Sequence, residues 1–357
     1  MAYTTIDDPS EYFHTRLYTG SGSSGLQVRN NANAGDFSPD FLWLAPRSNG
    51  DNNVIFDSSR GFNKQLKANG NDAEDTHSPV RFTRETNGFD IDTTDTNYNG
   101  SSRTYVAWQW IANNGTTATI SAGGDIGRET VSQVNTTAGF NICTYSGSGS
   151  QSSFGHSLGA KPHWIIIKNR DQADDWFVWV NGLNNNVGLD LNTTTALQTT
   201  NGFMGNEAPT STFVGLGDGD NTNASGENYI AYLFTSIKGF SKFGTYVGNG
   251  NENGPFVYTG FKPQWILFKN TGAAEEWVLQ DSVRDTENPV TKNIRVDSNI
   301  AEGDASAIDV DFLSNGFKIY SDQAQINSNN VKYLYAAFAE HPFVSSEGIP
   351  VTAKNIV

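Results

Sequence analysis

Two pairs of neighbouring carboxylates are the residues of this sequence best suited to acid–base chemistry. Asp174-Asp175 and Glu275-Glu276 each stand directly before a tryptophan, Trp176 or Trp277. Glycoside hydrolysis needs two carboxyl groups that face each other across the scissile bond. Neighbouring residues of a strand point to opposite faces, so neither pair makes such a couple by itself. We therefore interpret both pairs as parts of solvated turns and expect no catalytic residues in the chain.

Acidic loops could also hold calcium, which prefers oxygen ligands. One such loop contains Asp218 and Asp220, and another spans residues 90–95. Neither fits the EF-hand loop, because position 222 is a threonine and no glutamate follows at the required distance. We expect no cofactor. A structural calcium ion at Asp218 and Asp220 is the alternative to a loop whose polar side chains bond to their own backbone.

Four short motifs recur in the same order in each third of the chain. They are Tyr-x-Gly-x-Gly, a proline before an apolar run, Asn-Gly-Phe, and a tyrosine that opens a second apolar run. They begin at Tyr18, Pro39, Asn87 and Tyr105, then at Tyr145, Pro162, Asn201 and Tyr229, then at Tyr246, Pro263, Asn315 and Tyr333. This spacing matches small domains and far exceeds the 20–50 residue period of solenoids. The sequence is therefore an internal triplication.

The motifs predict β-strands. The run Trp164-Ile165-Ile166-Ile167 and its counterparts are short, rich in β-branched and aromatic residues, and apolar on both faces. That pattern is typical of a central strand covered by a second sheet. Asn-Gly-Phe predicts a tight turn with Asn-Gly at its centre, and helical periodicity is nearly absent. We therefore predict an all-β chain of three tandem β-sandwich, jelly-roll-like domains.

The motif positions also suggest boundaries. We expect an N-terminal arm at 1–11, repeat 1 at 12–112, a linker at 113–137, repeat 2 at 138–237, repeat 3 at 238–344, and a tail at 345–357. The linker is rich in Asn, Gly, Thr and Ser and shows no apolar periodicity. The tail carries Ile349, Val351 and Ile356, which is enough apolar surface to dock on a neighbour.

The bulk composition limits the classes of partner. The 357 residues carry a formal net charge of -15. Such a surface disfavours nucleic acid, because binding requires Lys and Arg contacts to phosphate. No segment reaches the length of a transmembrane helix, and the N-terminus shows no secretory signal. We therefore expect no membrane insertion, and synthesis in a cytoplasm. The single cysteine, Cys143, excludes an intrachain disulfide.

Comparison of the three copies separates scaffold positions from candidate ligand positions. We expect the residues that recur in all copies to form the structural core: Phe41, Trp164, Trp265, Tyr105, Tyr229 and Tyr333. Tyr98 is specific to one copy at a predicted loop tip, and Trp110 and Trp179 are specific residues near strand ends. Aromatic faces among Asn and Asp are typical of sugar-binding sites, so we predict these three as ligand-binding residues. A contact between domains or subunits is the alternative for Trp110 and Trp179.

As a set, the motifs resemble a domain of unknown function found in virion proteins of tailed phages, especially marine ones. The resemblance is clearest at residues 239–246, at Asn315-Gly316-Phe317 and at residues 337–343. It covers nearly the whole chain. The first copy departs most, because Ala45-Pro46-Arg47 replaces the Lys168-Asn169-Arg170 form. The resemblance implies a tail-fibre-like virion structural protein and brings no catalytic residues.

Two functions fit that implication. The first is recognition of a host cell-surface glycan by a fibre or spike module on the virion surface. The second is an architectural role as a capsid decoration, head-fibre or tail adaptor protein. We rank recognition first and a glycan-degrading tailspike enzyme third. The expected partners are other virion proteins, copies of the same chain with a trimer favoured, and a glycan.

Overall fold

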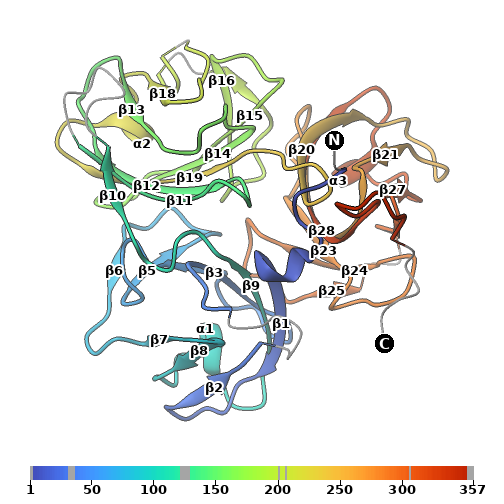
Figure 1. Cartoon of the computed structure of the whole chain (residues 1–357), viewed down its shortest axis with the longest axis horizontal. Helices are drawn as coiled ribbons and strands as arrows, with labels where there is room; N and C mark the ends of the chain where they lie inside the picture. The colour runs from blue at the N-terminus through green and yellow to red at the C-terminus, as the bar shows by residue number, and fades with distance from the viewer. Residues whose placement is uncertain are drawn as a thin grey trace.

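The chain folds into three β-sandwich units of the same strand order. This computed structural model describes residues 3–30, 37–120, 129–199, 202–205, 207–304 and 307–351. All pairs between its strands are antiparallel, which fits the predicted all-β class. Each unit packs a large sheet against a small one (Figure 1).

Unit 1 illustrates the common plan. Its large sheet has the order β1 (Phe13–Thr19), β9 (Thr104–Trp110), β3 (Phe41–Pro46), β4 (Val54–Asp57), β5 (Lys64–Lys67) and β6 (Asp75–Thr76). Its small sheet has the order β2 (Leu26–Val28), β8 (Gly88–Ile91) and β7 (Phe82–Glu85). A 3-10 turn, η1 (Pro9–Glu11), precedes β1, and the short helix α1 (Thr96–Asn99) precedes β9.

Unit 3 repeats this plan strand for strand. Its large sheet has the order β20 (Ser241–Val247), β28 (Lys332–Pro342), β22 (Phe261–Asn270), β23 (Val278–Asp281), β24 (Lys292–Arg295) and β25 (Gly303–Asp304). Its small sheet has the order β21 (Phe256–Tyr258), β27 (Gly316–Ile319) and β26 (Val310–Leu313). The helix α3 (Ala324–Asn327) takes the place of α1.

Unit 2 has a longer large sheet and a smaller second sheet. The large sheet has the order β10 (Ala118–Ile120), β11 (Thr130–Asn135), β12 (Phe140–Ser146), β19 (Asn228–Phe234), β14 (Trp164–Asn169), β15 (Phe177–Val180), β16 (Val187–Asp190) and β17 (Gln198–Thr199). The second sheet pairs β13 (Ser152–Gly155) with β18 (Phe213–Leu216), and α2 (Asp220–Asn223) precedes β19.

The prediction that residues 113–137 form a linker is wrong, because β10 and β11 lie in this segment and extend the sheet of unit 2. The inward residues of β11 are polar rather than apolar. Gln133 is fully buried, and its amide donates to the hydroxyls of Ser58 and Ser59 of unit 1, each at 2.9 Å. A strand buried through hydrogen bonds leaves no apolar pattern, which is why periodicity missed it.

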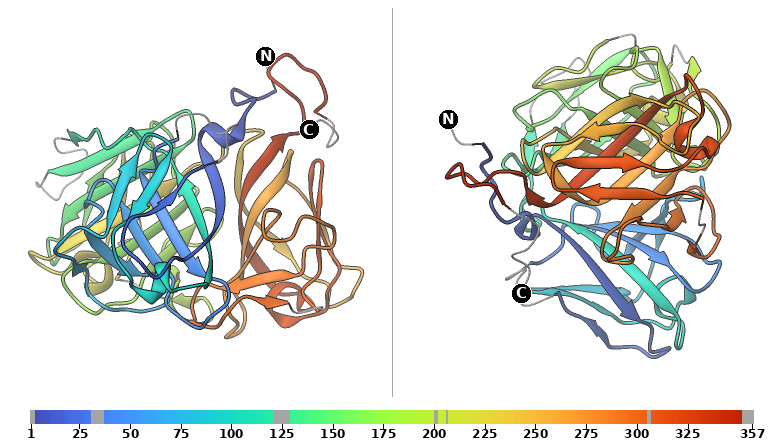
Figure 2. Two further views of the ribbon diagram at one scale, coloured as in Figure 1. Left: turned by 90° about the horizontal axis from the view of Figure 1, so that it is seen from below. Right: turned by 90° about the vertical axis from the view of Figure 1, so that its right-hand side faces the viewer.

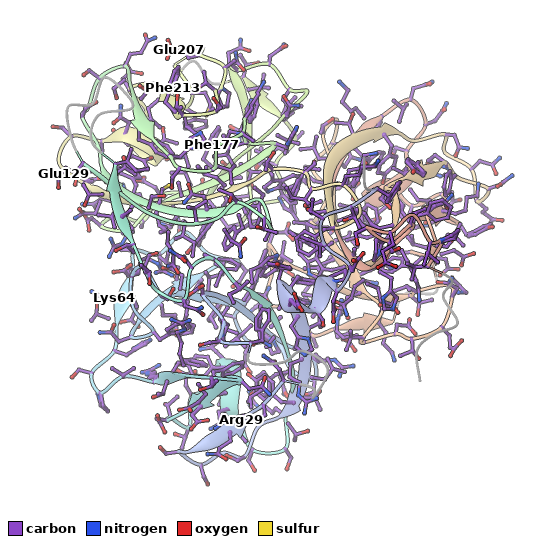
Figure 3. The ribbon with its side chains drawn as sticks, viewed as in Figure 1. Arg29, Lys64, Glu129, Phe177, Glu207 and Phe213 are labelled. Atoms are coloured by element: carbon purple, nitrogen blue, oxygen red, sulfur yellow. The ribbon has the colours of Figure 1, made fainter. Side chains whose placement is uncertain are left out.

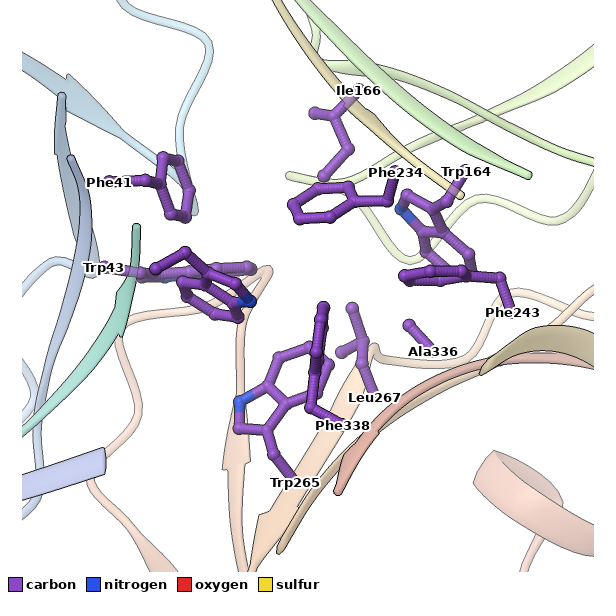
Figure 4. Close-up of a pocket in the computed structure, with 11 residues that line it drawn as sticks. Phe41, Trp43, Trp164, Ile166, Phe234, Phe243, Trp265, Leu267, Ala336 and Phe338 are labelled. Atoms are coloured by element: carbon purple, nitrogen blue, oxygen red, sulfur yellow. The ribbon is translucent and has the colours of Figure 1, made fainter. Parts of the chain in front are cut away.

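The units form a ring rather than a row (Figure 1). One hydrophobic cluster contains buried residues from all three large sheets. At its centre lie Trp110, Phe234 and Phe338, which occupy the same position in β9, β19 and β28. Their ring centroids are 5.4 to 6.4 Å apart (Figure 4). The strands of the second motif are thus apolar on both faces, because one face meets this shared core and the other meets the small sheet.

The interface between units 1 and 2, here interface 1/2, contains a buried ion-pair cluster. Arg60 donates to Asp57 at 2.5 Å, and both side chains are fully buried. Arg60 also pairs with Glu74 at 3.1 Å, and Glu74 pairs with Arg170 of unit 2 at 2.8 Å. Tyr232 of unit 2 donates its hydroxyl to Asp57 at 2.7 Å. The cluster therefore spans both units.

Interface 3/1 repeats this cluster with the equivalent residues. Arg284 pairs with Asp281 at 2.6 Å and with Glu302 at 3.0 Å. Glu302 pairs with Arg47 of unit 1 at 2.9 Å. The indole nitrogen of Trp108, also in unit 1, donates to Asp281 at 3.0 Å. Arg47 belongs to the segment in which the first copy departs most from the others in sequence. It nevertheless pairs with a glutamate of the neighbouring unit, as its counterpart Arg170 does.

Interface 2/3 is apolar at these positions. Strand register makes Val180 the counterpart of Asp57. Leu183 and Leu197 stand where the other interfaces have arginine and glutamate, and both pack against the central cluster. The backbone bond common to all three interfaces persists here, from the nitrogen of Leu197 to the oxygen of Thr271 at 3.0 Å. Thr271 stands where the other two interfaces have an arginine.

The first and fourth motifs are joined in every unit. The tyrosine pairs Tyr18–Tyr105, Tyr145–Tyr229 and Tyr246–Tyr333 stack at 5.1 to 5.2 Å between centroids. A fully buried asparagine that sequence comparison did not single out, Asn99, Asn223 or Asn327, accepts a hydrogen bond from the backbone of the glycine-rich loop. A Cβ at Gly20 would lie 2.3 Å from the oxygen of Gly100, so this glycine is needed for close approach. Tyr-x-Gly-x-Gly is therefore scaffold.

The third motif forms a turn, but not in the predicted register. In unit 1 the two-residue loop between β7 and β8 is Thr86-Asn87, and Gly88 already pairs with Glu85. Unit 3 does the same around Asn315. Asn201 of the second copy lies outside the described residues. This strand position requires glycine, because a Cβ at Gly88 would lie 2.1 Å from the oxygen of Val28 on β2.

Both ends of the described chain lie on one side of the ring, beside unit 3 (Figure 2). In the N-terminal arm, Tyr3 donates its hydroxyl to the oxygen of Gly260 at 2.9 Å, and Ile6 is buried in the central cluster. Asp7 accepts a hydrogen bond from the backbone nitrogen of Ser346 at 2.7 Å. The arm is thus packed on its own chain and holds the tail segment that follows β28.

Candidate functional site

The three aromatic residues predicted to bind a ligand are all buried. The exposed loop tip predicted for Tyr98 is wrong, because α1 turns its ring into the core of unit 1 against Phe82 and its hydroxyl accepts from Arg81 at 2.8 Å. Trp110 packs with Phe234 and Phe338 at the centre of the ring, and these three residues are here called the central triad. Trp110 therefore makes a contact between units, which was the alternative to ligand binding. Trp179 is buried within unit 2. These residues leave no ring face for a sugar.

The six residues expected to form the structural core are all buried: Phe41, Trp164, Trp265, Tyr105, Tyr229 and Tyr333. The first three face the centre of the ring, where they line a cavity of about 20 Å³ with the central triad (Figure 4). That volume holds about one water molecule. The cavity is a packing defect of the shared core rather than a ligand site.

Of the acidic residues singled out from the sequence, Asp174 and Asp220 line one open hollow of unit 2 together with Glu227. Asp218 and Asp220 are exposed, and within the described ranges no three His, Cys, Asp or Glu residues are placed to hold a metal ion. The calcium alternative therefore gains no support there. Asp174 accepts from the amide of Asn169 at 2.6 Å, whereas Asp175 accepts from Asn192 at 2.7 Å. The two neighbours lie in the irregular segment before β15, not in a strand, and each makes a different structural contact.

The surface best suited to a ligand is the outward side of the small sheet of unit 3, here called the outer face of unit 3. It carries three exposed aromatic residues, Phe256, Tyr258 and Tyr320, which are 47%, 48% and 45% exposed. The first two lie on the edge strand β21, where Val257 between them points into the core. Figure 3 shows the side chains on the ribbon. Because most large apolar side chains of the described structure are buried, three large rings in water require an explanation.

Polar groups surround these rings. Lys318 of β27 pairs with Phe256 on one side and with Asp311 of β26 on the other, so the three share one face. The ammonium of Lys318 lies 5.5 Å from the ring centroid of Tyr320 and donates to the oxygen of Gly254. A hollow of about 480 Å³ adjoins Tyr320 and is lined by Glu252, Ala307, Asp309, Tyr320, Ser321, Asp322 and Gln323.

Among the described residues, no salt bridge joins Asp309 or Asp311 to a cation, although Lys318 stands opposite Asp311 in the strand pairing. Burial raises the pKa of Asp309, and the charge of Asp311 raises it further. Burial raises the pKa of Asp311 as well. The Oδ1 atom of Asp309 is buried without a hydrogen-bond partner in the described structure. A buried acceptor without a donor costs free energy, and a ligand hydroxyl or amine can supply that donor.

Over their described residues, units 1 and 2 carry no such surface. Strand register places Gln27, Arg29 and Asp90 of unit 1 where unit 3 has Phe256, Tyr258 and Lys318. There Arg29 pairs with Asp90, and no aromatic ring is exposed on the strand. In unit 2 the counterpart strand β13 is buried along its whole length. The outer face of unit 3 is thus a specialised version of a common element.

The sequence holds one signal for this face, an alternating strand with aromatic residues that are specific to one copy. Phe256 and Tyr258 alternate with Val257, and the edge strand of the first copy, Leu26–Val28, has no aromatic residue. The small strands fall between the four motifs, where the copies differ in length. Without strand register the residues could not be aligned, so aromatic residues that lie in this short alternating strand went unnoticed.

The family model for a domain of unknown function, DUF7483, matches residues 8–342. The chain belongs to this family. The match spans all three units as one domain, in agreement with their shared core. No curated protein matches the chain. Among the described residues, no helix is long and apolar enough to cross a membrane.

Proposed function

We propose that this DUF7483 protein is a non-enzymatic structural protein of a phage particle surface that recognises a host glycan through the outer face of unit 3. The observation that supports recognition is the set of exposed rings of Phe256, Tyr258 and Tyr320 beside unpaired carboxylates. Aromatic faces stack on the C–H face of a pyranose, and carboxylates accept hydrogen bonds from its hydroxyls. The phage setting rests on the resemblance of the repeated motifs.

A binding test on the full chain decides this proposal. Wild type, Phe256→Ala and Tyr320→Ala are compared for retention on host cells and on their isolated surface polysaccharides. We expect both variants to lose retention, while Gln27→Ala, at the equivalent position of unit 1, retains it. Equal retention of all four proteins would contradict recognition at this face.

An architectural role is the second candidate, because the arm and the tail segment project together from one side of the ring (Figure 2). Ile349 at the tip of that tail segment is 59% exposed. Electron cryomicroscopy of the particle separates the two candidates. Copies around the tail with unit 3 directed outward support recognition, whereas copies tiled on the capsid with the outer face of unit 3 covered support decoration.

A further inference from the structure

The three exposed rings of unit 3 form a line. Strand pairing sets Tyr258 opposite Gly316 and Phe256 opposite Lys318. Because β27 runs antiparallel to β21, Tyr320 lies two residues beyond Lys318 on the side away from Tyr258. Lys318 and Tyr320 point to the same face, as residues two apart in an extended chain do. The backbone positions of the three residues therefore stand at three successive levels, and their rings are here called the aromatic stripe. At one end of the stripe the hydroxyl of Tyr258 bonds with that of Tyr3 at 3.0 Å, and the ammonium of Lys242 lies 5.3 Å from the centroid of its ring.

The spacing of the stripe sets the size of a matching ligand. Two residues along a strand span roughly 6.6–6.8 Å, so the stripe is about 13 Å long. This length accommodates about three consecutive pyranose rings in an extended chain. A single terminal sugar would reach only one of the levels. Three stacking positions in line are therefore suited to an internal stretch of a linear polysaccharide.

The charges around the stripe set the chemistry of that ligand. Glu252, Asp309 and Asp322 line the hollow beside Tyr320, and Asp311 lies on the neighbouring strand. The ammonium of Lys318 is already bonded to the oxygen of Gly254. These four carboxylates outnumber the ammonium groups of Lys318 and of Lys242, which lies 5.3 Å from the ring centroid of Tyr258, so a carboxylate, sulfate or phosphate group would meet net negative charge beside Tyr320. Hydroxyl and amine groups would instead donate to the carboxylates and to the buried oxygen of Asp309.

We infer that the outer face of unit 3 binds a linear glycan of at least three sugar residues that carries no acidic groups. This inference rests on the proposed function and adds the length and charge of the ligand to it. The chain lies along the aromatic stripe from Tyr258 through Phe256 to Tyr320. Its end beside Tyr320 meets the hollow with hydroxyl or amine groups.

A glycan array with neutral, amino and acidic linear glycans of one to eight residues tests the inference with the full-length protein. We expect binding to start at three residues, to be confined to non-acidic chains, and to fall roughly two- to tenfold for each ring removed by Phe256→Ala, Tyr258→Ala or Tyr320→Ala. Gln27→Ala on unit 1 is the matched control. Tyr3→Phe controls for the hydroxyl contact between Tyr3 and Tyr258.

The outcomes separate the two levels of the proposal. Equal binding of single sugars and longer chains, or binding of acidic glycans through the stripe, would overturn the inference and leave glycan recognition standing. Binding to no glycan, or binding that none of the three substitutions changes, would overturn both. Binding of a protein partner alone would assign the stripe to assembly and also overturn both.

Discussion

Interfaces 1/2 and 3/1 are held by buried ion pairs, whereas interface 2/3 is held by apolar contacts at the same positions. Asp57 and Asp281 each accept a hydrogen bond from an arginine of their own unit. Each also accepts one from an aromatic side chain of the next unit, the hydroxyl of Tyr232 or the indole nitrogen of Trp108. At interface 2/3 the aspartate counterpart is Val180, and the residue in place of the neighbouring ring is Ala336. Interface 2/3 therefore lacks both the buried aspartate and the side chain that would donate a hydrogen bond to it.

This difference teaches that the ring geometry does not depend on the chemistry of any one interface. All three interfaces keep a backbone bond between equivalent residues, at 2.8 to 3.0 Å, and all contribute to the same central cluster. A buried ion pair costs desolvation, so replacement of a complete pair by apolar residues is often neutral. Removal of a single partner is costly because it leaves a buried charge alone.

Arg60→Met is expected to give the largest effect. The change leaves Asp57 and Glu74 buried without their shared cation and should lower the free energy of unfolding by about 3–5 kcal/mol. Urea unfolding measures this loss. Lys67→Met is the control, because Lys67 pairs with Asp72 at the surface and should lose less than about 1 kcal/mol. Similar losses in both variants would contradict a special role for the buried cluster.

The same contrast shows how far sequence could predict the molecule. The recurring motifs gave the strands, because aromatic stacks and close-packed glycines demand fixed residue types. The ring could not be predicted, since Asp57, Arg60 and Glu74 meet Arg170 only through tertiary contacts. The sequence around Val180 does not indicate that this residue is the counterpart of Asp57, because only the strand register aligns the two. The candidate site was missed for a related reason, because Tyr320 lies beyond the end of β27 and joins Phe256 only through pairing.

Acid should affect the two kinds of interface in opposite directions. Burial alone would raise the pKa of Glu74 at interface 1/2, but Arg170 and Arg60 outweigh it and lower that pKa to about 2. Its stabilisation is complete above its unfolded pKa near 4.5 and is lost as the pH falls toward 2. At interface 2/3, burial and the charge of Asp175 raise the pKa of Asp190 to about 6. Protonation of Asp190 therefore adds stability as the pH falls through 6.

At about 1.4 kcal/mol per pKa unit each contribution is at most roughly 3 kcal/mol, and solvent screening reduces it. Unfolding free energies from pH 7 to pH 3 should separate them. Asp190→Asn should reduce the gain between pH 7 and pH 5, to which Asp297 also contributes because burial raises its pKa to about 6. Glu74→Gln should reduce the loss below pH 4.5. If Asp190→Asn left the profile unchanged above pH 5, the assigned role of Asp190 would be wrong.

Conversion of interface 1/2 to the apolar type should change the free energy of unfolding least, and it is the sharpest test of the comparison between the interfaces. The variant combines Asp57→Val, Arg60→Leu, Glu74→Leu and Arg170→Thr with Tyr232→Phe, which removes the hydroxyl that Asp57 accepted. The charges of the cluster are removed together, and two contacts are lost without replacement: the bond from the backbone nitrogen of residue 60 to Asp57, and the ion pair of the partly exposed Lys64 with Glu74 at 3.5 Å. The free energy of unfolding should therefore stay within about 2 kcal/mol of wild type. The salt dependence of stability should also decrease. A loss as large as the sum of the single substitutions would show instead that the ring requires ion pairs at this interface, and that the apolar contacts at interface 2/3 depend on features of unit 3 absent from unit 1.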